Sequence, residues 1–187
     1  SIPVENRTDP NGYQPYMRDE ATLARPWVLP GTVGMAHRIG GLGKQDVTGN
    51  VSYDPHDNEH MIKMRAEKVA RIADFLPPLD VLGPEQGDLL VVGWGGTYGA
   101  IRAAVEQAQS EGRAVASCHL RHLNPFPKDL GNIMSRYRQV LVPELNLGQL
   151  SMLLQARYPV RVIGLNKVQG QPFRIREIVA KINEILT

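Results

Sequence analysis

From residue 88 onward, the chain alternates between short runs that are almost entirely apolar and longer segments in which apolar residues recur every three or four positions. The apolar runs predict buried β-strands, and the longer spacing predicts amphipathic helices. Strands that are apolar at nearly every position are typical of a parallel sheet between two layers of helices. We therefore predict a three-layer α/β fold, with strands at 88–93, 114–120, 139–142 and 160–164 and helices at 99–111, 130–137, 147–158 and 175–186.

The first 53 residues differ from the rest of the chain. They are rich in proline, glycine and asparagine and show neither a strand period nor a helix period, so we expect an irregular, extended arm from the end of a preceding domain. Asp54 and Pro55 suit the N-cap and first position of a helix that ends at Pro77, and we assign 54–187 to one α/β domain. The apolar residues that recur along one side of this helix are Ile62, Ala66, Val69, Ala73 and Leu76.

Composition narrows the function classes. A net charge of +2, from 21 basic and 19 acidic residues spread along the chain, predicts no nucleic-acid partner and no anionic membrane surface. No apolar run approaches the roughly 20 residues that span a bilayer. The single cysteine, Cys118, excludes an internal disulfide and an iron–sulfur cluster ligated by this chain alone. Because the polar start 1–6 also lacks the apolar core of a signal peptide, we expect a cytoplasmic protein.

Polar or glycine-rich turns follow the four predicted strands. The carboxyl ends of parallel strands meet at one edge of the sheet, where ligands bind in α/β folds. We therefore expect these turns to form a common rim that contacts a ligand or a partner protein. The candidate rim residues are Gly95, Gly96, Thr97, Arg121, Asn124, Glu144 and Asn146.

The first of these turns lies in LLVVGWGGTYGAI at 89–101, a strand, a glycine-rich turn and the start of a helix. The order resembles a dinucleotide-binding fingerprint, but Gly93, Gly95 and Gly99 are spaced G-x-G-x-x-x-G, one residue too long. The next strand also ends without an acidic ligand for a ribose. We interpret the glycines as allowing a tight turn and close packing, with NAD binding as the alternative.

Two further patterns have both a functional and a structural interpretation. His56–His60 matches the H-x-x-E-H metal motif, but no third ligand is identifiable and the segment falls in a first helical turn, so we expect no metal. Arg121, between His119 and His122, offers a planar fork of donors for a phosphate or carboxylate. The alternative is a loop that hydrogen-bonds to its own backbone and to a partner surface.

The segment HRIGGLGK at 37–44 places two cations, Arg38 and Lys44, among three glycines. A flexible basic loop of this kind is suited to binding an anionic substrate. It does not match the phosphate-binding P-loop, because the first glycine of that pattern is missing and Gln45 replaces its serine or threonine. A solvated connection is the alternative.

Five segments in order resemble the C-terminal part of the alpha subunit of 2-oxoacid:ferredoxin oxidoreductases, and the 2-oxoglutarate type most of all. They are HRIGGLGKQDVTGNVSYDP at 37–55, VVGWGGTYGAI at 91–101, HLRHLNPFP at 119–127, VPELNLGQL at 142–150 and LNKVQGQPF at 165–173. The chain departs from the family in one loop, where many relatives have Gly-Leu-Glu-His and this chain has Gly41-Leu42-Gly43-Lys44.

The resemblance implies a thiamine-diphosphate enzyme that oxidatively decarboxylates a 2-oxoacid with coenzyme A and passes electrons to ferredoxin. It also implies a domain similar to the C-terminal domain of transketolase. Thiamine diphosphate, magnesium and the iron–sulfur cluster would be held elsewhere in the complete enzyme, chiefly by the beta subunit. The Tyr-Pro-x-Thr-Pro segment of the family's pyrimidine-binding domain has no counterpart here. We therefore expect this chain alone to bind none of these cofactors and to be inactive.

In this family the expected partners are the beta subunit and the remainder of the alpha subunit, with ferredoxin and coenzyme A reached through the complex. The resemblance makes 37–44 a substrate loop, with Arg38 and Lys44 as candidates for contacting the distal carboxylate of the substrate. We assign no catalytic residue to the chain. Two alternatives remain: the equivalent domain of a transketolase or 2-oxoacid dehydrogenase, and a domain that docks subunits without contacting a ligand.

Overall fold

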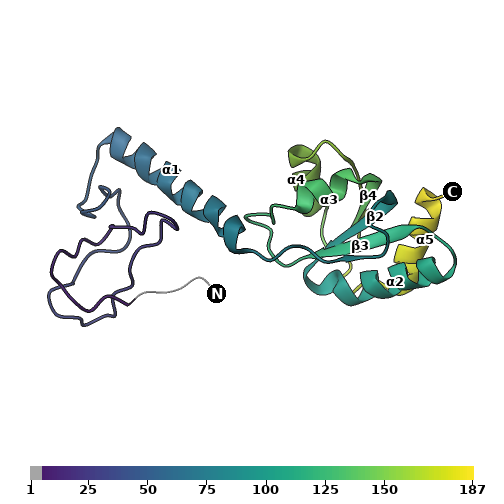
Figure 1. Ribbon diagram of the computed structural model, residues 1–187, viewed down its shortest axis with the longest axis horizontal. Helices are drawn as coiled ribbons and strands as arrows, with labels where there is room; N and C mark the ends of the chain where they lie inside the picture. The colour runs from purple at the N-terminus through teal and green to yellow at the C-terminus, as the bar shows by residue number, and fades with distance from the viewer. Residues whose placement is uncertain (1–5) are drawn as a thin grey trace. The chain divides into compact units, whose positions relative to one another are not determined.

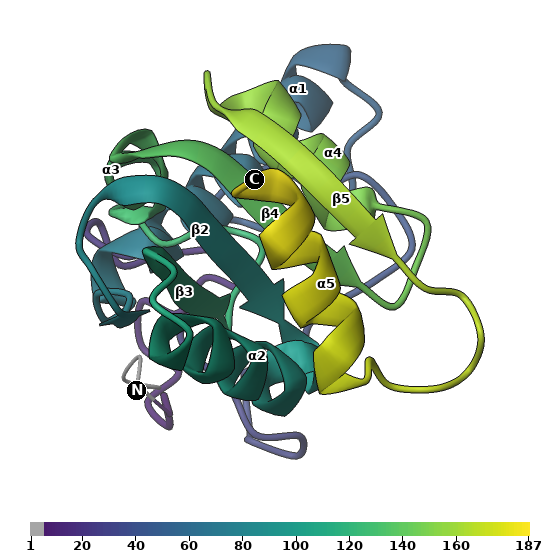
Figure 2. The same cartoon turned by 90° about the vertical axis from the view of Figure 1, so that its right-hand side faces the viewer.

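The structure, a computed structural model, describes residues 6–187 and divides the chain into two compact units, Ser1–Leu76 and Pro77–Thr187. Residues 1–5, which belong to the polar start of the predicted arm, lie outside the described residues. The division follows the first helix, whereas the domain boundary expected at residue 54 precedes it. Figure 1 labels the five α-helices and the strands β2, β3 and β4, and Figure 2 also labels β5.

The second unit is built on a five-stranded, mostly parallel sheet in the order β1-β3-β2-β4-β5. Its central strand, β2, runs parallel to β3 and β4, and β4 runs parallel to β5. The strand β1 is antiparallel to β3 at one edge and was not predicted. The bounds are Val81–Leu82 for β1, Gly87–Trp94 for β2, Val115–Leu120 for β3, Tyr137–Glu144 for β4 and Arg161–Asn166 for β5.

Helices cover both faces of this sheet, which confirms the predicted three-layer α/β fold. The helices α2 (Tyr98–Ser110) and α5 (Ile175–Ile185) pack together on one face, as Figure 2 shows. The helices α3 (Leu130–Ser135) and α4 (Gln149–Arg157) pack on the opposite face. All four lie within one or two residues of the predicted bounds.

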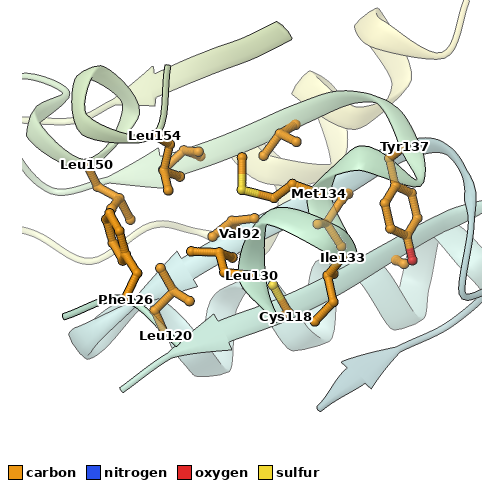
Figure 3. Close-up of a cluster of buried hydrophobic side chains, with 14 residues drawn as sticks. Val92, Cys118, Leu120, Phe126, Leu130, Ile133, Met134, Tyr137, Leu150 and Leu154 are labelled. Atoms are coloured by element: carbon orange, nitrogen blue, oxygen red, sulfur yellow. The ribbon is translucent and has the colours of Figure 1, made fainter. Parts of the chain in front are cut away.

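The two faces of β2 explain why this strand is apolar throughout. Leu89 and Val91 belong to the core beneath α2 and α5, while Leu90 and Val92 belong to the core beneath α3 and α4. All four side chains are fully buried. Figure 3 shows the second of these cores, where Val92 lies among side chains from β3, α3 and α4. Because successive residues of a strand point to opposite faces, a strand between two helical layers needs an apolar residue at every position.

The first unit combines an irregular segment with the helix α1 (Pro55–Arg71) and a 3₁₀ turn at Ile72–Phe75. Asp54 is the N-cap, and its carboxylate accepts a hydrogen bond from the His56 backbone N–H at 2.7 Å. As expected, residues 6–53 contain no regular helix or strand, and among them only isolated bridges such as Tyr16–Val47 occur. They are part of a compact unit, however, and do not form the extended arm that the sequence predicts.

The apolar residues that recur along α1 do not mark its most buried side. Ile62 is 51% exposed, whereas the adjacent Met61 is 3% exposed. The irregular segment packs along the side of α1 that carries Met61, whose sulfur lies 3.6 Å from Nη2 of Arg18. The irregular segment therefore decides which side of α1 is buried, and the spacing of apolar residues within α1 does not predict that side.

We predict that Leu154→Ala lowers the free energy of unfolding by about 2–5 kcal/mol, because it leaves a cavity in the core under α4. The matched control is Met152→Ala in the same helix, where the side chain is 66% exposed, and the expected change is about 0.5 kcal/mol or less. Urea unfolding followed by circular dichroism measures both. Equal losses in the two variants would contradict the assigned orientation of α4.

Candidate functional site

The side chain of Thr97 stabilises the turn from β2 to α2, in which this residue lies. This residue is buried, and its hydroxyl accepts a hydrogen bond from the Trp94 N–H at 3.2 Å and donates one to the Trp94 carbonyl at 2.7 Å. Gly95 and Gly96, in contrast, are exposed, and a Cβ at either position would have no atom within 4 Å. Of the three predicted rim residues in this turn, Thr97 supports the turn and the two glycines leave its outer side open.

Gly93, just before this turn, lies against two other elements. A Cβ at this position would lie 2.4 Å from Cδ1 of Ile101 in α2 and 3.0 Å from Nδ1 of His119 in β3. The absence of a side chain therefore allows the close approach of α2 and β3 to the end of β2. This packing agrees with the structural interpretation of the glycine pattern.

An open cleft of about 1180 Å³ lies beside this turn at the carboxyl ends of β2 and β3. Its lining includes Gly95, Tyr98, His119 and Arg121. The ring of Tyr98 meets that of His119 edge-on, with centroids 5.0 Å apart. Burial, together with the nearby charge of Arg121, lowers the pKa of His119, so this imidazole is neutral at pH 7. The cleft therefore combines a neutral, partly buried histidine with an exposed guanidinium that is suited to anions.

The structure does not bring Asn124 to this cleft together with Arg121. Asn124 is exposed and is not among the residues that line the cleft, and it precedes Pro125 through a cis peptide bond. Arg121 and Asn124, both predicted for the rim, therefore face different surroundings.

Glu144, at the end of β4, supports the start of α4. It is fully buried, and its carboxylate accepts hydrogen bonds from the Leu150 N–H at 2.8 Å, the Ser151 N–H at 2.8 Å and the Ser151 hydroxyl at 2.7 Å. Burial by itself raises the pKa of Glu144, but the hydrogen bonds from Ser151, Leu150 and Asn146 outweigh it and hold the pKa below its ordinary value. A carboxylate at a helix N-terminus also meets the favourable end of the helix dipole.

Asn146 has a similar role in the same loop. Its side-chain oxygen accepts hydrogen bonds from the Gly148 N–H at 2.7 Å and the Gln149 N–H at 3.2 Å. Gly148 has a φ of +94°, and a Cβ there would lie 2.9 Å from the Asn166 side chain at the end of β5. The polar groups of Glu144 and Asn146 are thus used within the loop, which leaves few of them for a ligand.

The turn after β5 is likewise internally bonded. Lys167 is buried, and its ammonium donates to the Pro172 carbonyl at 3.0 Å and to the Glu177 carboxylate at 2.9 Å. The hydrogen bond from Lys167, together with one from the Arg174 N–H, lowers the pKa of Glu177. These contacts fasten the loop between β5 and α5.

The first unit has an open cleft of its own, of about 950 Å³. Lys44 lines this cleft and is only 5% exposed, and its ammonium donates to the Leu42 carbonyl at 3.3 Å. Arg38 is exposed and does not line the cleft. The structure therefore places the two predicted substrate ligands in different surroundings.

Four further cations line the same cleft, and none of them was a candidate from sequence. They are Arg18, Arg25, Arg65 and Lys68. Burial, together with the charges of Arg25 and Arg18, lowers the pKa of Lys68, and burial with Arg25 and Arg65 lowers that of Arg18. The residues are spread over fifty positions of the chain, so no spacing motif could have identified them.

The candidate metal motif is also placed by the structure. Nε2 of His60 lies 2.8 Å from Oδ2 of Asp46. Within residues 6–187, no group of three or more histidine, cysteine, aspartate or glutamate side chains is arranged to hold a metal ion. Among the same residues, no helix is long and apolar enough to cross a membrane.

We predict that Glu144→Gln lowers the free energy of unfolding at pH 7 by about 1.5–3 kcal/mol, because the amide presents donors where two backbone N–H groups need a charged acceptor. The pKa of Glu144 is lowered by folding, so its contribution is present above its ordinary pKa and is lost as the pH falls through the folded value. The difference between the two proteins should therefore shrink in acid. Urea unfolding at a series of pH values measures it.

The matched control for this experiment is Glu106→Gln. Glu106 is half exposed and forms an ion pair with Arg102 one helical turn away. Such pairs contribute about 0.5 kcal/mol or less. If Glu144→Gln were as mild as this control, the carboxylate would not be the support for α4 that its contacts indicate.

Comparison with known proteins identifies the family. Residues 87–178 match the family model described as pyruvate:ferredoxin oxidoreductase core domain II. Over 167 residues, the chain is 45% identical to 2-oxoglutarate oxidoreductase subunit KorA of Mycobacterium tuberculosis, which covers 89% of this chain and 25% of that protein. It is 31% identical over 153 residues to 2-oxoacid:ferredoxin oxidoreductase 1, subunit alpha, of Aeropyrum pernix, covering 76% of this chain and 24% of that protein.

A solved structure agrees with these matches. The 2-oxoglutarate:ferredoxin oxidoreductase from Magnetococcus marinus, which has 2-oxoglutarate, coenzyme A and succinyl-CoA bound, superposes with a TM-score of 0.84 at 30% identity. The superposition covers 94% of this chain and 31% of that one, so the chain spans about a third of its length. The chain therefore belongs to the alpha subunits of the 2-oxoacid:ferredoxin oxidoreductases and corresponds to one part of such a subunit.

Proposed function

We propose that the complete protein is a thiamine-diphosphate-dependent enzyme that oxidatively decarboxylates 2-oxoglutarate with coenzyme A to an acyl-CoA and passes the electrons to ferredoxin. The observation that carries this proposal is the superposition of 94% of the chain on an enzyme that holds 2-oxoglutarate, coenzyme A and succinyl-CoA. The 45% identity to a subunit of a 2-oxoglutarate oxidoreductase supports the same substrate.

Thiamine diphosphate, magnesium and an iron–sulfur cluster belong, in this proposal, to other parts of the complete enzyme. The residues that the structure describes do not fit the cluster or the metal. Burial raises the pKa of the Cys118 thiol to about 12, whereas a cluster ligand must be a thiolate. The described residues also lack a set of carboxylates and histidines for a metal. We therefore derive no reaction step through a cofactor held by this chain.

Arg38 is the residue that we propose for the second carboxylate of the substrate. It is exposed, and in the same loop a Cβ at Gly40 or Gly41 would have no other atom within 4 Å. A guanidinium pairs with a carboxylate through two parallel hydrogen bonds, which favours a dicarboxylate over a monocarboxylate. Lys44, the other candidate from the sequence, lines a cleft that Arg38 does not line, so we do not propose it for the same carboxylate.

On the rim of the second unit, we propose that Gly95, Gly96 and Arg121 face a ligand or the backbone of a partner. Their exposure supports this role. We propose that Thr97, Glu144 and Asn146 act indirectly, since their hydrogen bonds hold the loops in place. We propose that Asn124, which is exposed, contacts a partner protein.

A docking role for the second unit is favoured by a specific observation. Leu147 is 83% exposed and Val168 is 63% exposed, and both lie in loops that follow the sheet. Because β4 and β5 are parallel neighbours, the two loops leave the same edge of the sheet, and apolar side chains exposed together are candidates for an interface. We propose that the beta subunit or the remainder of the alpha subunit covers them, with ferredoxin and coenzyme A reached through that assembly.

The proposed function is tested on the complete alpha subunit that contains this chain, produced together with its beta subunit. We expect reduction of ferredoxin that requires both 2-oxoglutarate and coenzyme A, and a higher kcat/KM for 2-oxoglutarate than for pyruvate. Omission of coenzyme A is the control. An assembled, cofactor-loaded enzyme that is inactive with every 2-oxoacid would contradict the proposal.

We predict that Arg38→Ala in this enzyme lowers kcat/KM about ten- to a hundredfold more for 2-oxoglutarate than for pyruvate, as expected for the loss of one charge-assisted hydrogen-bonded pair. Arg38→Lys keeps the charge but loses the planar guanidinium, so its loss of kcat/KM for 2-oxoglutarate should lie between that of the unchanged enzyme and that of Arg38→Ala. Steady-state kinetics with both substrates measures the ratio. Equal losses on both substrates would mean that Arg38 acts on the fold or on the shared 2-oxo group.

A further inference from the structure

Several positively charged side chains line the cleft of the first unit, and no carboxylate does. Among the described residues that line it, five are cationic, and none is an aspartate or glutamate. These residues are Arg18, Arg25, Lys44, Arg65 and Lys68. Positive charges that line one cleft repel one another, so these five side chains raise the free energy of the folded protein until an anion binds among them.

The acidic groups near the cleft are bonded to other residues. Asp46 contacts both Arg18 and His60. On α1, Glu59 pairs with Lys63 and Glu67 pairs with Arg71. Of these carboxylates, that of Asp46 contacts a cation that lines the cleft, Arg18, whereas the other two pair with Lys63 and Arg71, which do not line it.

Lys44 is the strongest sign that an anion belongs there. Its side chain is almost fully buried, yet the one hydrogen bond recorded for its three donors is to the Leu42 carbonyl at 3.3 Å. Burying an ammonium without a counter-ion is unfavourable. The backbone does not allow the lysine to move away easily, because the Ser52 N–H donates to the Gly43 carbonyl and the Gln45 N–H donates to the Asn50 carbonyl.

Two arginines of the cleft are held in position before any ligand binds. The guanidinium of Arg25 lies over the ring of Tyr16, 4.1 Å from its centroid. The guanidinium of Arg18 contacts the carboxylate of Asp46 and the sulfur of Met61. Prior positioning lowers the ordering cost of binding, since these long side chains lose little further freedom.

From this arrangement we infer that the cleft of the first unit binds a multiply charged anion that carries phosphate groups. The excess of cations over carboxylates matches the charge of a diphosphate or bisphosphate better than that of a dicarboxylate. The volume of about 950 Å³ exceeds the needs of a small dicarboxylate. The apolar side chains of Trp27, Leu29 and Ile39 also line the cleft and offer a surface to the organic part of such a ligand. Coenzyme A, a reactant of the proposed function, carries such groups, so the inference rests on that function and adds the residues that would hold them.

The test measures binding of inorganic pyrophosphate, adenosine 3′,5′-bisphosphate and 2-oxoglutarate to the full chain, by calorimetry and thermal shift at equal ionic strength. We expect saturable binding of the two phosphate compounds and weaker binding of 2-oxoglutarate. Tighter binding of the adenosine compound than of pyrophosphate would identify an organic phosphate as the ligand, and the reverse would identify a free phosphate compound.

Three variants separate a specific site from general attraction. Lys68→Gln should weaken phosphate binding about tenfold or more. The matched control, Lys63→Gln, removes the same charge from the same helix outside the cleft and should change binding less than about twofold. Lys44→Met should abolish most of the binding while the chain without ligand stays at least as stable, because an uncompensated buried charge is removed.

Several results would overturn the inference. One is the absence of saturable binding of either phosphate compound. Another is an equal loss in Lys63→Gln and Lys68→Gln, which would indicate unspecific attraction. Tighter binding of 2-oxoglutarate than of both phosphate compounds would instead make the cleft a carboxylate site.

Discussion

The burial of β2 on both faces is the constraint on which the second unit depends. Its residues are shared alternately between the core under α2 and α5 and the core under α3 and α4. Because β2 is central and parallel to both neighbours, the turns that follow β2, β3 and β4 all leave the sheet at the same edge. The position of every candidate residue on the rim follows from this one arrangement.

The rim contains two kinds of residue: those whose side chains hydrogen-bond within the loops, and those that are exposed to solvent. Glu144 and Asn146 use their oxygens to bond the first backbone N–H groups of α4, and Thr97 uses its hydroxyl to close the turn after β2. Helices leave such N–H groups without partners, so a nearby acceptor is needed regardless of any ligand. Gly95 and Arg121 are free of this demand and remain exposed. Exposed positions held by bonded neighbours are well suited to contacting a second molecule.

The sheet and its helices were predictable because, along the second unit, the spacing of apolar residues in each segment matches the helix or strand that the segment forms. The two-residue strand β1 was not, since so short an edge strand carries no period of its own. On α1, Met61 and Ile62 are neighbours with different exposure, and the choice between them depends on where the irregular segment packs. The sequence places Glu144 on the rim, but its role depends on its hydrogen bonds to the start of α4, which begins five residues later. The basic cleft brings together residues such as Arg18 and Lys68 that no local pattern connects.

The two basic features of the first unit suit different anions: the exposed Arg38 suits a carboxylate, and the cleft around Lys44 suits phosphate groups. The charges of the cleft repel one another in the absence of a ligand, which supports a neutralising partner. The most direct measurement is an experimental structure of the complete enzyme with 2-oxoglutarate and coenzyme A bound. The account predicts a carboxylate within hydrogen-bonding distance of Arg38 and phosphate groups in contact with Lys44 and Lys68. Ligands bound away from both features would contradict it.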